Sequence, residues 1–319
     1  MKKSILLLLS IVLFSCSQTT STKKEQTTDL KKQNLIGIVR SITEYRYKGI
    51  EDFGAIKKGE LNVIITTQYN QNGDETERIC INADGSLKSK IISKYDDEGN
   101  KVKLTFYNSR DSIEGKIIWT YDSSNKLIEK IDSTDFFIGK AIYKYDEKHN
   151  LTSKSVYDSN GSLEKSTEYT YDKSSNIIEE KEYGFNRTLA AVYTFEYDNN
   201  RNIVEKKEYD ADGNLEITDT YEYDSQNNKI QEEGFVEVGQ TKHSLSIRHS
   251  YKYDHQNNIL KDELYIPMNN KSEDKTYQYN NFDKNHNWVS RTEYLEESKK
   301  FATTGKSIML MERKIEYGE

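Results

Sequence analysis

Aromatic and polar residues alternate along most of this chain. In the segment TEYTYD, Tyr169 and Tyr171 fall on one side of an extended strand, and Glu168, Thr170 and Asp172 fall on the other. The same aromatic pair, two residues apart, recurs at Tyr143/Tyr145, Phe195/Tyr197, Tyr221/Tyr223, Tyr251/Tyr253 and Tyr277/Tyr279. A period of two predicts β-strands, because a helix would scatter each pair around its circumference.

A repeated phrase follows these strands: Tyr-Asp, three turn-forming residues, Asn and an apolar residue. It begins at Tyr95, Tyr121, Tyr145, Tyr171, Tyr197, Tyr223, Tyr253 and, with Phe in place of Tyr, Phe282. Successive copies are 26, 24, 26, 26, 26, 30 and 29 residues apart, and a weaker turn such as YDADGN at Tyr209 lies between them. The fixed period predicts an array of units of about 13 residues, each one strand and one turn.

The turn residues have a physical reason. The Asp side chain can accept a hydrogen bond from the backbone two residues on, and the Asn or Gly that closes the turn tolerates a positive φ. Pro267 is the single proline, which suits continuous antiparallel pairing because proline removes a ladder donor.

The repeat predicts an all-β fold, a repetitive antiparallel meander of roughly twenty short strands between Leu61 and Tyr317. Apolar residues make up only 34% of the chain, too few to fill a two-sheet sandwich of this length. We therefore expect the sheet to curl into an open spiral or shell with Tyr and Ile inward. The alternative is a flat single-layer sheet roughly 95 Å long.

Two segments break the period. Residues 47–60 form an excursion before the array, and residues 232–244 lengthen one hairpin. Both are candidate functional loops, since loops on rigid scaffolds often carry function, and both are also compatible with tolerated insertions.

The chain begins with an export signal. Lys2 and Lys3 precede an apolar run from Ile5 to Phe14 that is too short to span a bilayer, and the run ends at Cys16 in a lipobox-like LFSC. We expect residues 1–16 to be a lipoprotein signal with lipidated Cys16, 17–33 a flexible tether, and 34–319 the repeat domain. The expected location is the cell envelope, anchored by lipid, in the outer membrane, facing either the periplasm or the surface.

Charge and cysteine content limit the partners. Without residues 1–15 the chain keeps 44 of its 46 basic and all 53 acidic residues, a net charge of −9. An acidic chain without a basic run in its sequence argues against nucleic acid and against electrostatic adhesion to anionic lipid. Cys80 is the one cysteine after Cys16, so no disulfide framework forms within the chain, and we expect Cys80 to be a buried small hydrophobe.

The repeat resembles the YD repeat of the RHS family, through Tyr121-Asp122 to Asn125, Tyr145-Asp146 to Asn150 and the segment from Tyr209 to Asn214. The resemblance covers roughly residues 61–317 and implies a long antiparallel β-strip that curls into a spiral or shell. The short chain carries no RHS core motif and no toxin domain, so enclosed cargo is not expected. Signal and repeat together resemble small YD-repeat lipoproteins of Bacteroidetes-type envelopes, and the Lys/Glu-rich sheet is similar in kind to spirochaete surface lipoproteins.

No residue set carries identifiable catalytic or metal chemistry. DSNGS at Asp158 and DADGN at Asp210 match only the start of a calcium loop, which favours turns. The five histidines lie in or near expected turns without a zinc signature, and nucleophile and phosphate-loop motifs do not occur. We expect no cofactor and no metal. A glycan-cleaving carboxylate pair cannot be picked from 53 acidic residues.

The tyrosines are the candidate ligand-binding residues: Tyr169, Tyr171, Tyr221, Tyr223, Tyr251 and Tyr253. Stacked Tyr rings can bind sugars, although they equally well hold a sheet together as cross-strand pairs. The leading hypothesis is a non-enzymatic binding or scaffolding lipoprotein for a glycan or an envelope protein. Its alternatives are a glycan-cleaving surface enzyme and assembly through exposed terminal strands, and the oligomeric state stays open.

Overall fold

The computed structural model describes residues 28–134, 137–237, 243–299 and 302–318. These residues form one short helix, one 3-10 turn and a single twenty-stranded antiparallel sheet. The elements are α1 (Asp29–Lys32), β1 (Val39–Asp52), β2 (Ala55–Tyr69), β3 (Glu75–Asn82), β4 (Leu87–Tyr95), β5 (Lys101–Tyr107), β6 (Ile113–Tyr121), β7 (Leu127–Thr134), β8 (Phe137–Tyr145), β9 (Leu151–Asp158), β10 (Leu163–Tyr171), β11 (Ile177–Tyr183), β12 (Leu189–Tyr197), β13 (Ile203–Asp210), β14 (Leu215–Tyr223), β15 (Lys229–Glu237), β16 (His243–Tyr253), β17 (Ile259–Ile266), η1 (Pro267–Asn269), β18 (Lys271–Phe282), β19 (Trp288–Lys299) and β20 (Ala302–Tyr317). No helix in these ranges is long and apolar enough to cross a membrane.

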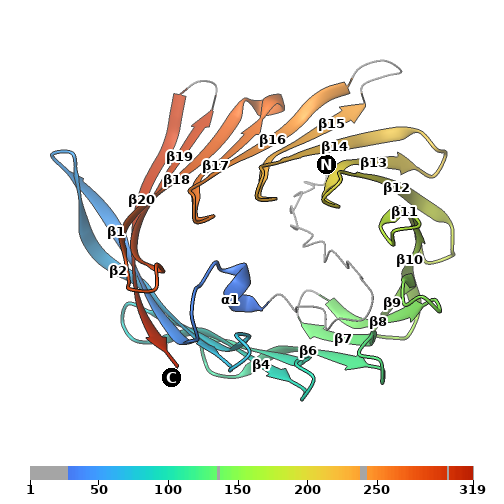
Figure 1. The fold of residues 1–319 in the computed structure, drawn as a ribbon, viewed down its shortest axis with the longest axis horizontal. Coiled ribbons are helices and arrows are strands. Elements are labelled where there is room, and N and C mark those ends of the chain that lie inside the picture. The colour runs from blue at the N-terminus through green and yellow to red at the C-terminus, as the bar shows by residue number, and fades with distance from the viewer. Residues whose placement is uncertain (1–27, 135–136, 238–242, 300–301, 319) are drawn as a thin grey trace.

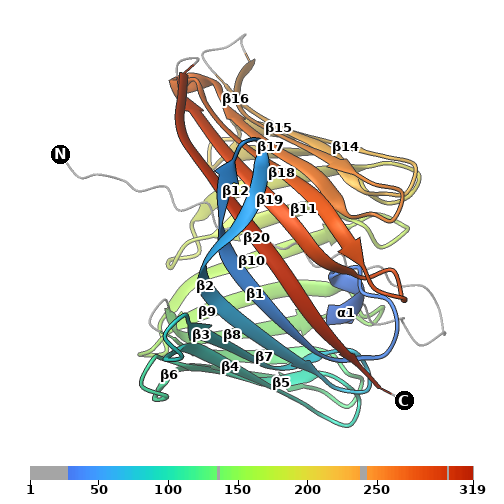
Figure 2. The same ribbon diagram turned by 90° about the vertical axis from the view of Figure 1, so that its left-hand side faces the viewer.

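The sheet is a closed barrel, because β1 pairs with β2 on one side and with β20 on the other (Figure 1). The expected open spiral or shell is therefore wrong, and so is the flat single layer. Closure pairs the backbone groups that two edge strands would leave exposed. The strands cross the wall obliquely, as closure of a barrel requires (Figure 2).

The segment expected to be the first loop is a β-hairpin instead, and only its first two residues, Tyr47 and Lys48, take part in the closing pairing with β20. Residues 47–60 continue β1 to Asp52 and start β2 at Ala55, joined by Phe53 and Gly54 with φ of 50° and 80°. Of the second expected loop, residues 232–237 belong to β15 and 243–244 to β16, while 238–242 lie outside the described residues. The long first hairpin carries no YD phrase, so the repeat pattern did not reveal it.

The YD turns follow the expected chemistry: Asn125 and Gly213 adopt the expected positive φ, whereas the turn at Asp172 differs in where the positive φ falls. Asp172 accepts hydrogen bonds from the backbone N–H of Ser174 at 2.8 Å and of Asn176 at 2.9 Å. The positive φ, 62°, falls on Ser175 rather than on the closing Asn176, whose side-chain amide instead donates to the second Asp172 oxygen at 2.8 Å. Asp210 makes the same bonds, so the DADGN segment is a turn, as predicted.

The first described residues dock inside one end of the barrel, where α1 lies within the ring of strands (Figure 1). Leu30 and Leu35 pack against Val39, Ile42 and Tyr69. Residues 29–33, expected in the tether, are thus ordered as α1 and its C-cap. Cys16 and the signal segment lie outside the described residues.

This packing identifies the lumen face of every strand. Ile42 and Tyr69 point toward α1, and strict alternation along strands carries their face around the barrel through the pairing register. Both tyrosines of each Tyr-x-Tyr pair fall on this lumen face. The residue between them falls outside and is exposed, as at Thr120, Thr170 and Gln278.

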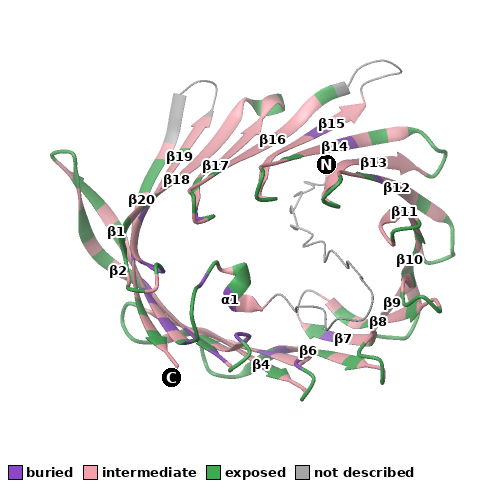
Figure 3. Cartoon of the chain, viewed as in Figure 1, coloured by how far each residue is buried: buried purple, intermediate pink, exposed green. Residues whose placement is uncertain are grey.

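The wall is one layer thick, and few of its residues are fully buried (Figure 3). The buried apolar cluster gathers around α1 and the β1–β2 end of the wall. Cys80 was expected to be buried, but it is only half-buried and lies on the lumen face beside Ile65. A hollow, thin-walled fold explains how a chain with so few apolar residues folds at all.

Candidate functional site

The two tyrosines of each pair have different roles. The one next to the turn donates its hydroxyl to a backbone carbonyl of the previous strand: Tyr171 to Leu151 at 2.9 Å and Tyr223 to Ile203 at 3.0 Å. The same bond is made by Tyr95, Tyr121, Tyr145, Tyr197, Tyr253 and Tyr279. These tyrosines tie the end of each strand to its neighbour, and they are structural.

In four of the pairs the other tyrosine takes no part in this ladder and lies opposite a carboxylate, and so does Tyr193, two residues before Phe195. Tyr143 differs, because it lies opposite Lys154. Tyr221 is paired in register with Glu232, and Tyr251 with Asp262. We call the full set the tyrosine–carboxylate belt. It comprises Tyr169 with Glu180, Tyr193 with Glu208, Tyr221 with Glu232, Tyr251 with Asp262, and Tyr277 with Glu293. The belt lines the lumen from β10 to β19.

Burial and the nearby acids keep the belt tyrosines protonated. Burial, reinforced by Glu208, raises the pKa of Tyr193 to about 12, and the Tyr193 hydroxyl lies 3.5 Å from a Glu208 oxygen. Burial and Glu293 likewise raise the pKa of Tyr277 to about 12. The belt therefore presents phenolic donors beside carboxylate acceptors at neutral pH.

Lysines interrupt the belt. Lys206 lies 4.9 Å from the centre of the Tyr193 ring and 3.8 Å from Asp219. Burial raises the pKa of Glu180, although Lys206 and Lys154 oppose it. The wall is a mixed surface of rings, acceptors and donors rather than a purely acidic one.

His249 sits between two belt residues. Its Nδ1 lies 2.8 Å from the Tyr251 hydroxyl, and its Nε2 contacts Asp262. It lies within β16, whereas the sequence suggested that the histidines lie in or near turns. The order Tyr–His–Asp resembles an activated nucleophile, but burial and Asp262 raise the pKa of Tyr251, which makes it a poor one. Among the described residues no cluster of acids, histidines or cysteines could hold a metal ion.

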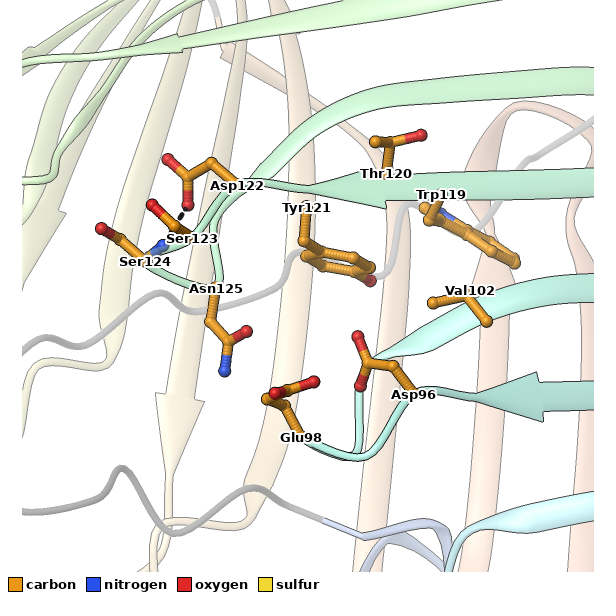
Figure 4. Close-up of a pocket in the computed structure, with 10 residues that line it drawn as sticks. All are labelled: Asp96, Glu98, Val102, Trp119, Thr120, Tyr121, Asp122, Ser123, Ser124 and Asn125. Carbon is orange, nitrogen blue, oxygen red and sulfur yellow. Dashed lines mark hydrogen bonds between the residues drawn. The ribbon is translucent and has the colours of Figure 1, made fainter.

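A pocket of about 640 Å³ lies at the rim between two successive YD turns (Figure 4). Trp119 and Tyr121 lie side by side above Asp96 and Glu98 of the preceding turn. Asp122 lies at the pocket edge and accepts backbone hydrogen bonds within its own turn. These bonds, of which the one from the Lys126 N–H has the largest effect, lower the pKa of Asp122. That carboxylate stays ionised and is unsuited to act as a general acid.

A second pocket of about 540 Å³ connects the rim to the belt. It is lined by Tyr277 of the belt, by Tyr279 of the ladder and by the apolar side chains of Leu260 and Phe282. An aromatic surface thus continues from the lumen wall to the mouth of the barrel.

Arginines mark the wall next to the belt. The Arg313 guanidinium carbon lies 3.4 Å from the centre of the Trp288 ring, and Arg291 stacks at 4.4 Å. Arg313 and Arg46 both bond Glu44, at 2.8 and 2.7 Å. This cluster joins β19, β20 and β1 at the seam of the barrel.

Of the six candidate tyrosines, Tyr169, Tyr221 and Tyr251 lie in the belt, and Tyr171, Tyr223 and Tyr253 in the ladder. The belt acids and the other two belt tyrosines were missed. A signal for the acids does exist: Glu180, Glu232 and Asp262 each follow a YD tyrosine by nine residues. That spacing places the acid on the return strand, opposite the first tyrosine of the pair.

Comparisons with known proteins add little. No protein-family model matches the chain, and no curated protein does. Similar solved structures include TcdB2-TccC3 without its hypervariable C-terminal region, at 13% identity and a TM-score of 0.45 over 86% of this chain. The Photorhabdus luminescens Tc holotoxin pore is 13% identical with a TM-score of 0.46 over 86% of this chain. A porin-like protein from Bacteroides uniformis is 11% identical with a TM-score of 0.36, over 87% of this chain and 96% of that one.

This chain spans 16% of the length of the toxin chains that it matches. Because each TM-score is below 0.5, no functional conclusion follows from these similarities.

Proposed function

We propose that this barrel is a non-enzymatic binding module whose lumen wall holds a glycan. The observation that carries the proposal is the tyrosine–carboxylate belt, in which five ring–acid pairs repeat along one wall. A sugar presents an apolar face to an aromatic ring and hydroxyls to carboxylates and phenols. A ligand made of repeated rings fits a wall made of repeated pairs.

We further propose that the barrel stands in water in the cell envelope, held by a lipid on Cys16. Exposed outward positions on the strands carry charges, as at Lys94, Lys144 and Glu196. A barrel wall that faces lipid carries a continuous apolar band instead. The charged exterior therefore supports a wall that faces solvent.

A glycan array with envelope and host polysaccharides tests the proposal. Protein lacking residues 1–27 is suitable, because α1 and all twenty strands lie beyond them. We expect a specific hit that is lost in the double variant Tyr221→Leu with Tyr277→Leu. The matched control, Thr220→Leu with Thr276→Leu, changes the outward faces of the same strands and should bind as before. A blank array, or equal loss in both variants, contradicts luminal binding.

The same protein and the glycan that it binds also distinguish a binding module from the alternative, a glycan-cleaving enzyme. Glu180 is the belt acid whose raised pKa suits a general acid. If the protein cleaves the glycan that it binds and Glu180→Gln abolishes cleavage while binding remains, the protein is a hydrolase. Binding without cleavage supports the module proposed here.

A further inference from the structure

One row of outward side chains crosses six neighbouring strands. The pairing register joins Lys94 to Lys103, Lys103 to Ile118, Ile118 to Ile131, Ile131 to Lys140 and Lys140 to Tyr157. The row runs from β4 to β9, and we call it the Lys–Ile row. It places two isoleucines at its centre with lysines on both sides.

The isoleucines of the row are exposed. Ile118 and Ile131 each keep 40% of their surface accessible, and Ile138 beside the row keeps 61%. Ile118 and Ile131 pair with each other and have Lys103 and Lys140 as their other neighbours, so each is only partly covered. An apolar strip of this kind on an outer wall indicates an interaction surface.

Most of the lysines around this strip lack an acidic partner. Among the paired outward positions of β4–β8, lysine occupies six (Lys90, Lys94, Lys103, Lys116, Lys140 and Lys144) and an acid occupies one, Glu129. Of the six, Lys90 pairs with Asp111, and the other five form no ion pair among the described residues.

Lys94 and Lys103 stand directly opposite each other, an arrangement that destabilises a sheet unless an anion relieves it. On the opposite wall three outward lysines have an acid partner, although Lys252 stands opposite Lys261 there. Lys181 pairs with Glu179 at 2.9 Å, Lys261 pairs with Glu263 at 2.5 Å, and Lys207 pairs with Glu205. The net negative charge of the chain hides this segregation, and the sequence suggested no basic surface.

We propose that the Lys–Ile row is a docking surface for an anionic lipid bilayer, which it contacts side-on. Lysines attract the phosphate headgroups, and the two isoleucines between them enter the headgroup boundary. A soluble polyanion would use the lysines and would leave the exposed isoleucines without a partner. The mixed cationic and apolar row therefore favours a membrane surface.

Sedimentation with lipid vesicles tests this, using protein without residues 1–27 so that no lipid anchor contributes. We expect binding to phosphatidylglycerol-containing vesicles, weaker in high salt, and none to pure phosphatidylcholine. The triple variant Lys94→Gln, Lys103→Gln, Lys140→Gln should weaken partitioning at least about tenfold. The matched triple Lys181→Gln, Lys207→Gln, Lys261→Gln has the same net charge and should bind like the parent.

A second pair of variants tests the apolar part of the row. Ile118→Ser with Ile131→Ser should abolish the binding that survives in high salt and leave binding to soluble dextran sulfate unchanged. Equal loss in the two lysine triples would overturn the proposal, because net charge alone would then explain the binding. Capture of dextran sulfate without capture of vesicles would overturn it as well.

Discussion

Glu44 on the first strand and Arg313 on the last are paired in register, and an Arg313 Nε to Glu44 Oε2 bond of 2.8 Å joins them. Their side chains are 7% and 12% exposed. Arg46 bonds the second Glu44 oxygen, and Trp288 covers the guanidinium of Arg313. The first and last strands of the sheet thus meet through a buried carboxylate that is bonded to two arginines.

Removing this carboxylate charge should destabilise the whole barrel. Glu44→Gln leaves the nearly buried Arg313 and the half-buried Arg46 without their acid, and we expect a loss of about 3 kcal/mol in the free energy of unfolding. Urea unfolding followed by circular dichroism measures it. Lys314→Gln, at a lysine 72% exposed on the same strand, serves as control and should change little. Equal stability of the parent and Glu44→Gln would show that the seam does not depend on this pair.

The same pair predicts a response to acid. Burial opposes ionisation of Glu44, but Arg313 and Arg46 outweigh it and lower its pKa below 4.5. A lowered carboxyl pKa contributes stability that is present above the unfolded-state value and is lost as the pH falls through the folded-state value. The parent should therefore lose stability below about pH 4.5, and Glu44→Gln should lose less. Parallel melting curves over this range provide the comparison.

Ladder and belt tyrosines should respond oppositely to loss of the hydroxyl. Tyr223→Phe with Tyr279→Phe removes two bonds to strand carbonyls and should cost about 1 kcal/mol each, with glycan binding retained. Tyr221→Phe with Tyr277→Phe changes the same two strands and should weaken binding with little effect on stability. Thermal melting and glycan titration of both double variants measure these effects on stability and binding. If both lose stability equally, the belt has a structural role as well.

The turns predict a glycine-specific effect. Gly213 closes the Asp210 turn with a φ of 84°, and a Cβ there would meet no atom within 4 Å. Gly213→Ala should therefore cost about 1 kcal/mol through backbone strain alone. Gly184 has no positive φ and an added Cβ would make ordinary contact with Thr188. Gly184→Ala should be close to neutral, and chemical denaturation of the two variants gives the contrast.

High pH should open the barrel in a narrow range. Burial raises the pKa of Tyr193, Tyr197 and Tyr277 from 10.0 to about 12. A raised pKa contributes stability that is complete below the unfolded value and is lost as the pH rises through the folded value. We expect stability to fall between pH 10 and about 12. Ultraviolet titration should show that the last tyrosines to ionise do so together with the loss of circular dichroism, and complete tyrosine ionisation near pH 10 in a folded barrel would contradict the expectation.

The strands and turns were predictable because they depend on local chemistry. Alternation around Tyr169 and Tyr171 identifies a strand, and Asp172 specifies the turn that follows. Closure was not predictable, because it depends on β1, which has no YD phrase and pairs with a strand more than 250 residues away, as Glu44 does with Arg313. A repeat pattern describes neighbours and contains nothing about how the two ends meet.

The candidate site was half predictable for a similar reason. Tyr221 and Tyr223 look alike in the sequence, and only the bond from Tyr223 to Ile203 separates them. The partner of Tyr221 is Glu232, whose position depends on the register of the next strand. The basic surface was not predictable for the same reason, because Lys94 and Lys140 lie far apart in the chain and share one row only in the folded wall.

Closure also makes the width of the barrel depend on the number of repeats in the chain. Each YD repeat adds one hairpin, so the chain returns to the same rim after every pair of strands, and the seam between β1 and β20 is unaffected by how many pairs lie between them. Duplication or deletion of one repeat would therefore enlarge or shrink the lumen by a fixed step while leaving its ends joined. During evolution, recombination between repeats could adjust the width of the lumen to ligands of different size, without a change in the sequence of any single strand.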